Sequence, residues 1–459
     1  MNPKSLTVAW LWCAAFAGTA AAQVCESPSS SAACCSPPAA SAGTNAAGAP
    51  ACGPAACSTP CAAPAAGTAA TCAAPTGSAS CGTPDLIATD PAASAAPRGG
   101  PSPADRGLTD LAPLLEPIRE VFRVPGLGAA LVREGRLDAL GVTGIRRVGS
   151  DAAIEVDDPF HLGSCGKALT ATVAAVMVEH GQTKWTATIG EAFPEYASTM
   201  HAPFRDVTLR DLLAHRGGFP SRSSTFDQAI AAFQGTMPAQ RSALVRYAVA
   251  NVPAYSPGSQ FNYSDVGYSV GGAMIGRAAG EPWEDLVREL LAEPLQLTSL
   301  GFGAPGAGRP ESVPRGHVLR DGELVALGVG PGEDLANPAI GPAGTIHLSL
   351  SDWATFAAFH LRGARRESTE LLSADGFRAL HEDPYGQGYA LGWFVTTTDR
   401  WDAGRALTHT GSCGAWSALI WILPERNAAI LATSNYGGGS GFQALQLAVD
   451  RIGEKYLAP

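Results

Sequence analysis

The sequence predicts a domain of the α/β type, in its α+β form, built on a sheet that is mainly antiparallel. Two observations carry this prediction: strand-like segments stand near both ends of the domain, at residues 128–137 and 416–433, and apolar helical segments lie between them. A third observation gives the start of the domain: aromatic side chains and apolar periodicity begin only near Arg106. The domain is therefore expected to cover residues 106–459.

The first elements expected in this domain are a helix and a strand pair. Four apolar side chains recur at helical spacing over residues 108–121, although Pro113 and Pro117 each remove a helix donor. Residues 128–137 then alternate like an antiparallel strand, with a turn at Glu134 and Gly135.

Helical periodicity, in two cases with glycine just past the end, predicts the elements that follow. Helices are expected at residues 168–180, 209–215, 351–361 and 442–452. Strands are expected at residues 416–422 and 428–433, joined by residues 423–427.

Composition narrows the class of function. The 459-residue chain has a formal net charge of −10, and 46% of its residues are apolar, enough for a sizeable core. A nucleic-acid-binding protein usually has a basic face, and the sequence has no long run of lysine and arginine. Binding to nucleic acid, or to a membrane surface through basic side chains, is therefore not expected.

Residues 1–22 have the composition of a secretory signal peptide. Lys4 gives a short positive region, and an apolar stretch follows that is too short for a confident membrane span. Small residues then precede Gln23, as a cleavage site requires. We expect export without a lipid, to the periplasm or the medium; an uncleaved anchor is the alternative.

Residues 23–105 are expected to form a disordered linker. They are mostly alanine, proline, serine, glycine, threonine and cysteine, with no aromatic side chain, and cannot bury enough apolar surface to offset the entropy of ordering. Eight of the eleven cysteines lie there, between Cys25 and Cys81. Their irregular spacing disfavours a zinc site. Disulfides within the linker or to a cell-wall or other partner remain open, as do thiols without a function.

The first chemistry-bearing segment is Ser164-x-x-Lys167, at the start of an apolar helix. Residues three apart share one helix face, so the two side chains are expected to be neighbours. A serine hydroxyl needs a nearby base, and a lysine serves if burial lowers its pKa. The helix N-terminus also offers N–H groups where an oxyanion would form. An isolated match of this kind arises often by chance.

The second segment is Phe261-Asn-Tyr263-Ser-Asp265, which precedes an apolar helix. Tyr263 could transfer a proton if neighbouring cations made its phenol acidic. Asp265 could bind Lys167 or the substrate. Taken alone, the segment is more simply explained as a turn in which Asp265 caps the helix.

The third segment is Thr408-His409-Thr410-Gly411-Ser412, before the last strand pair. An edge strand beside the nucleophile can offer a backbone N–H, here that of Ser412, as the second oxyanion donor. Gly411 would let the strand lie close to the substrate. His409 could act electrostatically or in proton transfer, although a histidine in a strand is more often structural.

In this order the three segments resemble the serine β-lactamase, penicillin-binding protein and esterase family. The resemblance extends over residues 110–455, and includes segments at residues 207–219, 341–353 and 385–393. It implies a β-lactamase-like fold, with an antiparallel sheet flanked by helices, an all-helical region carrying the tyrosine, and the active site between them. No metal or cofactor is implied.

The resemblance also implies a role for each matching residue. Ser164 matches the acylated serine, Lys167 its activating lysine and Tyr263 the catalytic tyrosine. His409, Thr410 and Gly411 match the Lys/His-Thr-Gly triad, and the N–H groups of Ser164 and Ser412 match the oxyanion hole.

Two departures from the family pattern bear on the substrate. Asp265 stands where penicillin-recognising members usually have asparagine, and an ionised aspartate can only accept hydrogen bonds. His409 stands where class C β-lactamases have lysine. Both favour an esterase or D-amino-acid peptidase over a β-lactamase.

Cys165 and Cys413 could both flank this site. A disulfide between them is doubtful, because Cys165 points in a different direction on the helix from the family's bridged position. Two small buried cysteines are the favoured interpretation. Cys165 is rotated off the Lys167 face and is not expected to be the nucleophile.

The function predicted from the sequence is an exported serine hydrolase that cleaves an ester or amide bond through an acyl-enzyme on Ser164. Its substrate would be a small molecule or a peptidoglycan-derived fragment. The alternatives are a β-lactamase, a D-alanyl-D-alanine carboxypeptidase, or a sensor of β-lactams or wall fragments that does not turn over.

Overall fold

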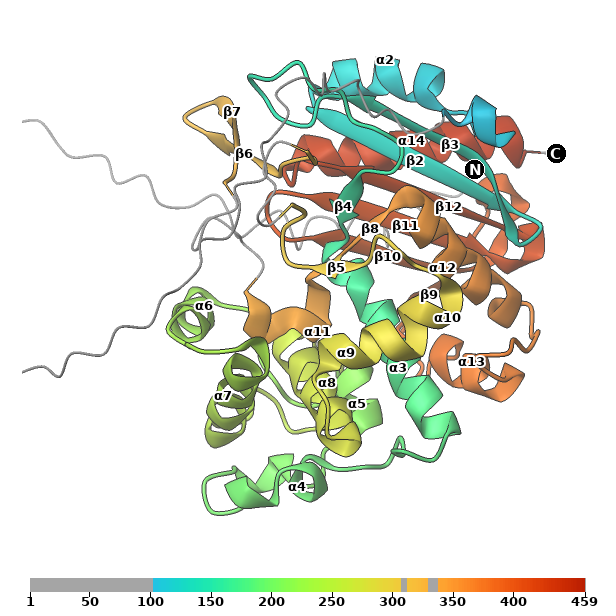
Figure 1. Cartoon of the computed structure of the whole chain (residues 1–459). Coiled ribbons are helices and arrows are strands. Elements are labelled where there is room, and N and C mark those ends of the chain that lie inside the picture. Colours follow the sequence, from blue (N-terminus) through green and yellow to red (C-terminus); the bar gives the residue numbers. More distant parts are fainter. Residues whose placement is uncertain (1–101, 307–311, 329–336, 459) are drawn as a thin grey trace, which may run out of the picture. The chain divides into compact units, whose positions relative to one another are not determined.

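The computed structural model describes residues 102–306, 312–328 and 337–458. The predicted signal peptide lies outside the described residues, and so does the predicted linker except for residues 102–105. The described part contains a large sheet with helices on both faces, together with a region made mainly of helices (Figure 1).

The main sheet has seven strands in the order β1-β3-β2-β12-β11-β10-β9. All neighbours are antiparallel except β1 and β3, so the predicted mainly antiparallel sheet is confirmed. Its strands are β1 (Thr109–Asp110), β2 (Gly126–Arg133), β3 (Arg136–Gly144), β9 (Phe394–Thr398), β10 (Gly404–Ser412), β11 (Ser417–Leu423) and β12 (Ala428–Ser434).

The period-two alternation of β2 places its side chains in two cores. Leu127 and Leu131 pack with the helices of one face, and Ala130 and Val132 with those of the other. The expected turn at Glu134 and Gly135 joins β2 to β3. Both residues have positive φ, as a tight hairpin requires. The first face carries α2 (Ala112–Phe122) and α14 (Gly439–Tyr456), and the second carries α12 (Leu350–Ala364).

The first helix begins later than the sequence indicated. A helix over residues 108–121 was expected, but Thr109 and Asp110 pair with β3 and form β1. Helix α2 then begins at Ala112, whose N–H donates to the Asp110 carboxylate at 2.8 Å. Pro113 falls in the first turn, where no intrahelical donor is needed.

The helical region packs around α3 (Gly166–Glu179), most of which is buried. Two of its helices begin with capping boxes, at Thr188 and Thr208. Its other members are α4 (Ile189–Ala192), α5 (Leu209–Leu213), α6 (Ser224–Ala231), α7 (Met237–Ala250), α8 (Asp265–Ala279), α9 (Trp283–Val287), the π-helical η5 (Arg288–Ala292) and α10 (Glu293–Leu295).

Smaller elements connect the two regions. A three-stranded sheet has the order β4-β8-β5, and β6 and β7 form a separate hairpin. The bounds are β4 (Pro159–His161), β5 (Gly301–Phe302), β6 (His317–Arg320), β7 (Glu323–Ala326), β8 (Ile346–Ser349), α11 (Gly341–Gly344) and α13 (Ala374–His381). The 3-10 turns are η1 (Ala104–Arg106), η2 (Gly163–Cys165), η3 (Pro194–Tyr196), η4 (Ala202–Phe204), η6 (Pro338–Ile340), η7 (Arg400–Asp402) and η8 (Pro424–Arg426).

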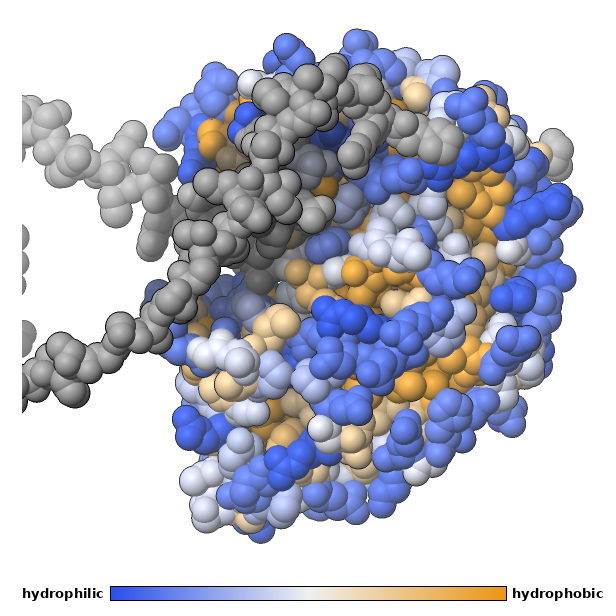
Figure 2. All heavy atoms as spheres, in the orientation of Figure 1, coloured by the Kyte–Doolittle hydropathy of each residue, from blue (hydrophilic) through white to orange (hydrophobic). Residues whose placement is uncertain are grey.

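The surface is mixed in character. On the face shown in Figure 2, hydrophilic residues predominate around the rim and apolar residues show between them. Within the described ranges, no helix combines the length and apolarity needed to cross a bilayer.

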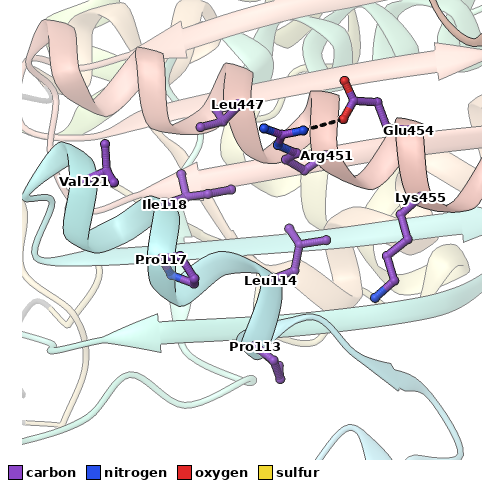
Figure 3. A pocket seen from close by; sticks show the side chains of 9 residues that line it. All are labelled: Pro113, Leu114, Pro117, Ile118, Val121, Leu447, Arg451, Glu454 and Lys455. Atoms are coloured by element: carbon purple, nitrogen blue, oxygen red, sulfur yellow. Dashed lines mark hydrogen bonds and ion pairs between the residues drawn. The ribbon is translucent and has the colours of Figure 1, made fainter.

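A surface groove of about 530 Å³ runs between α2 and α14 (Figure 3). Its floor is apolar, and one edge carries the Arg451–Glu454 ion pair of 2.9 Å. None of the candidate catalytic residues lines it. The lining residues are Pro113, Leu114, Pro117, Ile118, Val121, Leu447, Arg451, Glu454 and Lys455.

Candidate active site

Ser164 is placed by a turn that leads from β4 into α3. Leu162 N–H donates to Ile346 O of β8 at 2.9 Å, which fixes the end of β4. Gly163 then adopts a left-handed φ of 51°, and a Cβ there would lie 2.4 Å from Ser412 N. Only glycine satisfies both conditions, so the turn brings Ser164 directly against β10.

Gly411 makes the same contact possible from the other side. A Cβ at Gly411 would lie 1.9 Å from Leu162 O and 3.0 Å from Cys165 N. The close approach expected of Gly411 is therefore present, but it is made to the turn before α3, which the sequence did not indicate.

The edge of β10 is open at this point. Strand β9 pairs with β10 only as far as Thr408, and residues 409–412 continue beside the Ser164 turn. The Ser412 hydroxyl accepts from Gly414 N at 3.0 Å, so its side chain belongs to the following turn. The structure thus brings the backbone N–H of Ser412 next to Gly163, the residue that precedes Ser164.

Lys167 lies beside Ser164, as their spacing predicted. The Lys167 Nζ is 3.1 Å from Ser164 Oγ, and the lysine side chain is fully buried. Burial disfavours the charged ammonium and lowers the pKa of Lys167, whereas the charge of Asp265 acts in the opposite direction.

The ammonium group has three acceptors for its three N–H donors. Besides Ser164 Oγ, they are Asp265 Oδ1 at 2.6 Å and Ala343 O at 2.7 Å. The contact between Asp265 and Lys167 that the sequence suggested is present in the structure. Ala343 could not be found from the sequence, because a backbone carbonyl leaves no trace in a pattern of side chains.

Tyr263 lies beside Lys167, in the segment that leads into α8. The Lys167 Nζ lies 4.7 Å from the centre of its ring. Burial, with a contribution from the charge of Asp265, raises the pKa of Tyr263 well above its usual value, and a hydrogen bond with Ser164 opposes the increase only in part. The phenol is therefore a neutral proton donor, rather than the acidified group that the sequence analysis required.

His215 is a site residue that the sequence analysis did not single out. Its ring packs on Tyr263 with centroids 4.2 Å apart, and its Nδ1 accepts from Ser264 N–H at 3.1 Å. Burial lowers the pKa of His215, so the ring is neutral. The signal was present, since His215 lies in the family-like segment at residues 207–219, and its ring packs directly against Tyr263.

His409 is buried on β10 in a single tautomer. Its Nδ1 lies 2.6 Å from Thr410 O, and its Nε2 lies 3.3 Å from Tyr389 OH. A carbonyl can only accept, so Nδ1 carries the hydrogen and Nε2 accepts from Tyr389. Burial, aided by the charge of Lys167, lowers the pKa of His409 to about 3. His409 therefore presents no positive charge to the site.

Cys165 and Cys413 lie close to strand β10. Cys165 is 2% exposed, and its Sγ donates to His409 O at 3.4 Å. Burial raises the pKa of the Cys165 thiol, which keeps the thiol protonated. No disulfide joins Cys165 to the half-buried Cys413. Over the described residues, no cluster of histidine, cysteine, aspartate and glutamate is arranged to hold a metal ion.

Comparison with known proteins gives the family of this chain. A model of the Beta-lactamase family matches residues 112–452. Over 344 residues the chain is 25% identical to penicillin-binding protein 4 of Amycolatopsis lactamdurans, covering 71% of this chain and 84% of that protein.

Solved structures show the same fold. The octameric penicillin-binding protein homologue from Pyrococcus abyssi superposes with a TM-score of 0.62 and 20% identity, over 76% of this chain and 78% of that one. The D-amino acid amidase from Ochrobactrum anthropi SV3 does so with a TM-score of 0.59 and 20% identity, over 75% of this chain and 96% of that one. The family resemblance predicted from the sequence is confirmed: the chain belongs to the serine β-lactamase-related family of hydrolases.

Proposed function

We propose that this protein cleaves a small amide or ester through an acyl-enzyme on Ser164. One observation carries the proposal: a fully buried lysine amine lies 3.1 Å from the serine hydroxyl and 2.6 Å from a carboxylate. A serine needs a base at hydrogen-bond distance, and burial shifts this lysine toward the neutral form that can act as one.

Acylation begins from the neutral form of Lys167, which burial favours. Asp265 Oδ1, 2.6 Å from Nζ, accepts a hydrogen bond from the amine and holds it beside Ser164. The free amine then takes the Ser164 proton as Oγ attacks the substrate carbonyl. The N–H groups of Ser164 and Ser412 receive the oxyanion at the start of α3.

Tyr263 protonates the leaving group. Its raised pKa makes the phenol a proton donor to the departing nitrogen or oxygen, and the Lys167 ammonium returns a proton to the phenolate. Water then attacks the acyl-enzyme. The same groups transfer protons in the opposite direction, so that the acid is released and Ser164 is restored.

The names of relatives support an amide or peptide substrate, since they include a D-amino acid amidase and a penicillin-binding protein. The test uses the full chain and its Ser164→Ala variant with four substrates. These are a D-amino acid amide, a short aryl ester, a D-alanyl-D-alanine peptide and a chromogenic cephalosporin.

Turnover of at least one substrate that is lost in Ser164→Ala supports the proposal and identifies the substrate class. A stable mass increase on the native protein, without turnover, would instead make it a sensor that acylates and stalls. Equal hydrolysis by both proteins would rule out Ser164 as the nucleophile.

Export to the periplasm or the medium is a second part of the proposal, supported by the composition of residues 1–22. N-terminal sequencing of protein recovered from outside the cytoplasm is expected to begin at Gln23. A wall or disulfide partner of residues 23–105 would appear as a reducible adduct on a non-reducing gel.

A further inference from the structure

We infer that Asp265 makes the site select substrates whose leaving group is uncharged, such as amides and alkyl esters, over those whose leaving group ends in a carboxylate. This inference rests on the proposed function and adds the substrate class. It follows from where the site places its positive and negative charges.

The positive charge of Lys167 is not available to a substrate. Its side chain is 0% exposed, and its three donors are used by Ser164, Asp265 and Ala343. A carboxylate on the leaving group would have to displace one of these acceptors to reach the ammonium. Lys167 is therefore matched to the chemistry at Ser164 rather than to the recognition of an anion.

The negative charge of Asp265 remains accessible. The carboxylate binds Lys167 through Oδ1, yet its side chain is 18% exposed at the N-terminus of α8. An ionised carboxylate accepts hydrogen bonds and repels a second carboxylate. An amide N–H on the substrate can donate to Asp265, whereas a terminal carboxylate in the same place meets a like charge.

Among the residues that the structure describes, those at 409–412 of strand β10 offer no compensating cation on the other side of the site. Strand β10 carries His409 there, and this ring is 1% exposed, with a hydrogen only on Nδ1. Its Nε2 is occupied as an acceptor for Tyr389. A lysine or an imidazolium would attract a carboxylate, but this neutral ring does not.

Arg222 is another cation near the site that could bind a substrate carboxylate. It follows Ser221, whose hydroxyl donates to Tyr263 O at 2.9 Å, so it lies on the helical side of the site. Its Nε forms an ion pair with Asp227 at 2.8 Å. Because Asp227 already balances this charge, a substrate carboxylate would have to share the arginine with it.

The test compares two thioesters that share a benzoylglycyl acyl group. Their thiol leaving groups differ only in ending with a carboxamide or a carboxylate. With the full-length protein, we expect kcat/KM, corrected for uncatalysed hydrolysis, to favour the carboxamide at least about 10-fold at low salt, and less at high salt, because screening weakens like-charge repulsion.

Asp265→Asn keeps the shape of the side chain and removes its charge, so the selectivity ratio is expected to fall at least about fivefold. Asp375→Asn is the matched control: this aspartate is 82% exposed and pairs with Arg378 on α13. Its ratio is expected to equal that of the native protein. Should Asp265→Asn be inactive, the salt dependence of the native ratio decides the question.

Equal rates on the two thioesters, or a preference for the carboxylate, would overturn the inference. A carboxylate preference that disappears in Arg222→Gln would assign selectivity to Arg222. Both results leave the proposed function intact, provided that Ser164→Ala hydrolyses neither thioester. If native protein and Ser164→Ala hydrolyse them equally, the proposed function fails, and the inference fails with it.

Discussion

The Nζ of Lys167 lies 2.7 Å from the carbonyl oxygen of Ala343, and this hydrogen bond joins helix α3 to the short helix α11. No side-chain substitution at residue 343 removes this contact, because the acceptor belongs to the backbone. The position of the lysine therefore depends on whatever holds α11 in place. The turn η6 leads directly into α11, and its Pro338 carbonyl accepts from Arg241 at 3.3 Å.

Glu284→Gln is expected to destabilise this support strongly. Arg241 and Glu284 form an ion pair whose side chains are only 4% and 3% exposed, so the variant leaves a buried guanidinium without its counter-charge. Breaking such a pair costs about 3–5 kcal/mol. Urea unfolding measures the loss, and the matched Asp285→Asn, in an exposed pair with Arg288, is expected to cost less than about 1 kcal/mol. Similar losses in both variants would contradict the prediction.

Lys167→Met is expected to lower kcat/KM by about 10²–10⁴-fold, since it removes the base while keeping an unbranched side chain of similar length. The measurement uses whichever substrate the native protein hydrolyses. Lys184→Met is the control, because Lys184 is exposed and forms a surface pair with Glu191 at 3.3 Å. Undiminished turnover in Lys167→Met would show that another group activates Ser164.

Gly411→Ala is expected to separate β10 from the turn that carries Ser164. The added methyl would lie 1.9 Å from Leu162 O, a backbone atom that cannot rotate away. Overpacking of this kind costs about 1–3 kcal/mol, and the Ser412 N–H would move with the strand. We expect lower thermal stability and lower kcat. Gly439→Ala, where a Cβ meets nothing within 4 Å, is expected to change neither.

Stability is expected to fall in mild acid. Burial lowers the pKa of His161, His381 and His409 to about 3, whereas the unfolded chain has values near 6.5. The unfolded state therefore binds more protons between these values, so lowering the pH through this window favours unfolding. Each residue contributes about 1.4 kcal/mol per pH unit below 6.5.

Urea titrations at pH 7, 6 and 5 test this pH dependence. His409→Gln is expected to reduce the slope, and His201→Gln, at an exposed position, is expected to leave it unchanged. A free energy of unfolding that is constant from pH 7 to pH 5 would contradict the prediction.

The sequence indicated which residues meet at this site better than it indicated their protonation states. Ser164 and Lys167 are neighbours on one helix, so spacing alone brought them together. Tyr263 and His409 lie far away in sequence, and only the family resemblance placed them beside Ser164. Local patterns also gave the β2–β3 turn and most helices, but not the start of α2, because the strand pairing of Thr109 depends on β3.

What could not be predicted depends on tertiary packing. The neutral state of His409 follows from burial and from the orientation of the Thr410 carbonyl. The raised pKa of Tyr263 follows from burial beside Asp265. Neither quantity is encoded in the identity of a residue or in its spacing, so the motif indicates which atoms meet and the fold determines their protonation.

The direct contact between β10 and the Ser164 turn restricts how this enzyme can acquire new substrates. His409 and Gly411 face inward, and Gly411 has no room for a side chain. Thr410 is half-buried and Ser412 is exposed, so substitutions at these two positions can change the outer side of the strand without moving Ser164. A combinatorial library for altered specificity should therefore vary positions 410 and 412 and leave the alternate positions fixed.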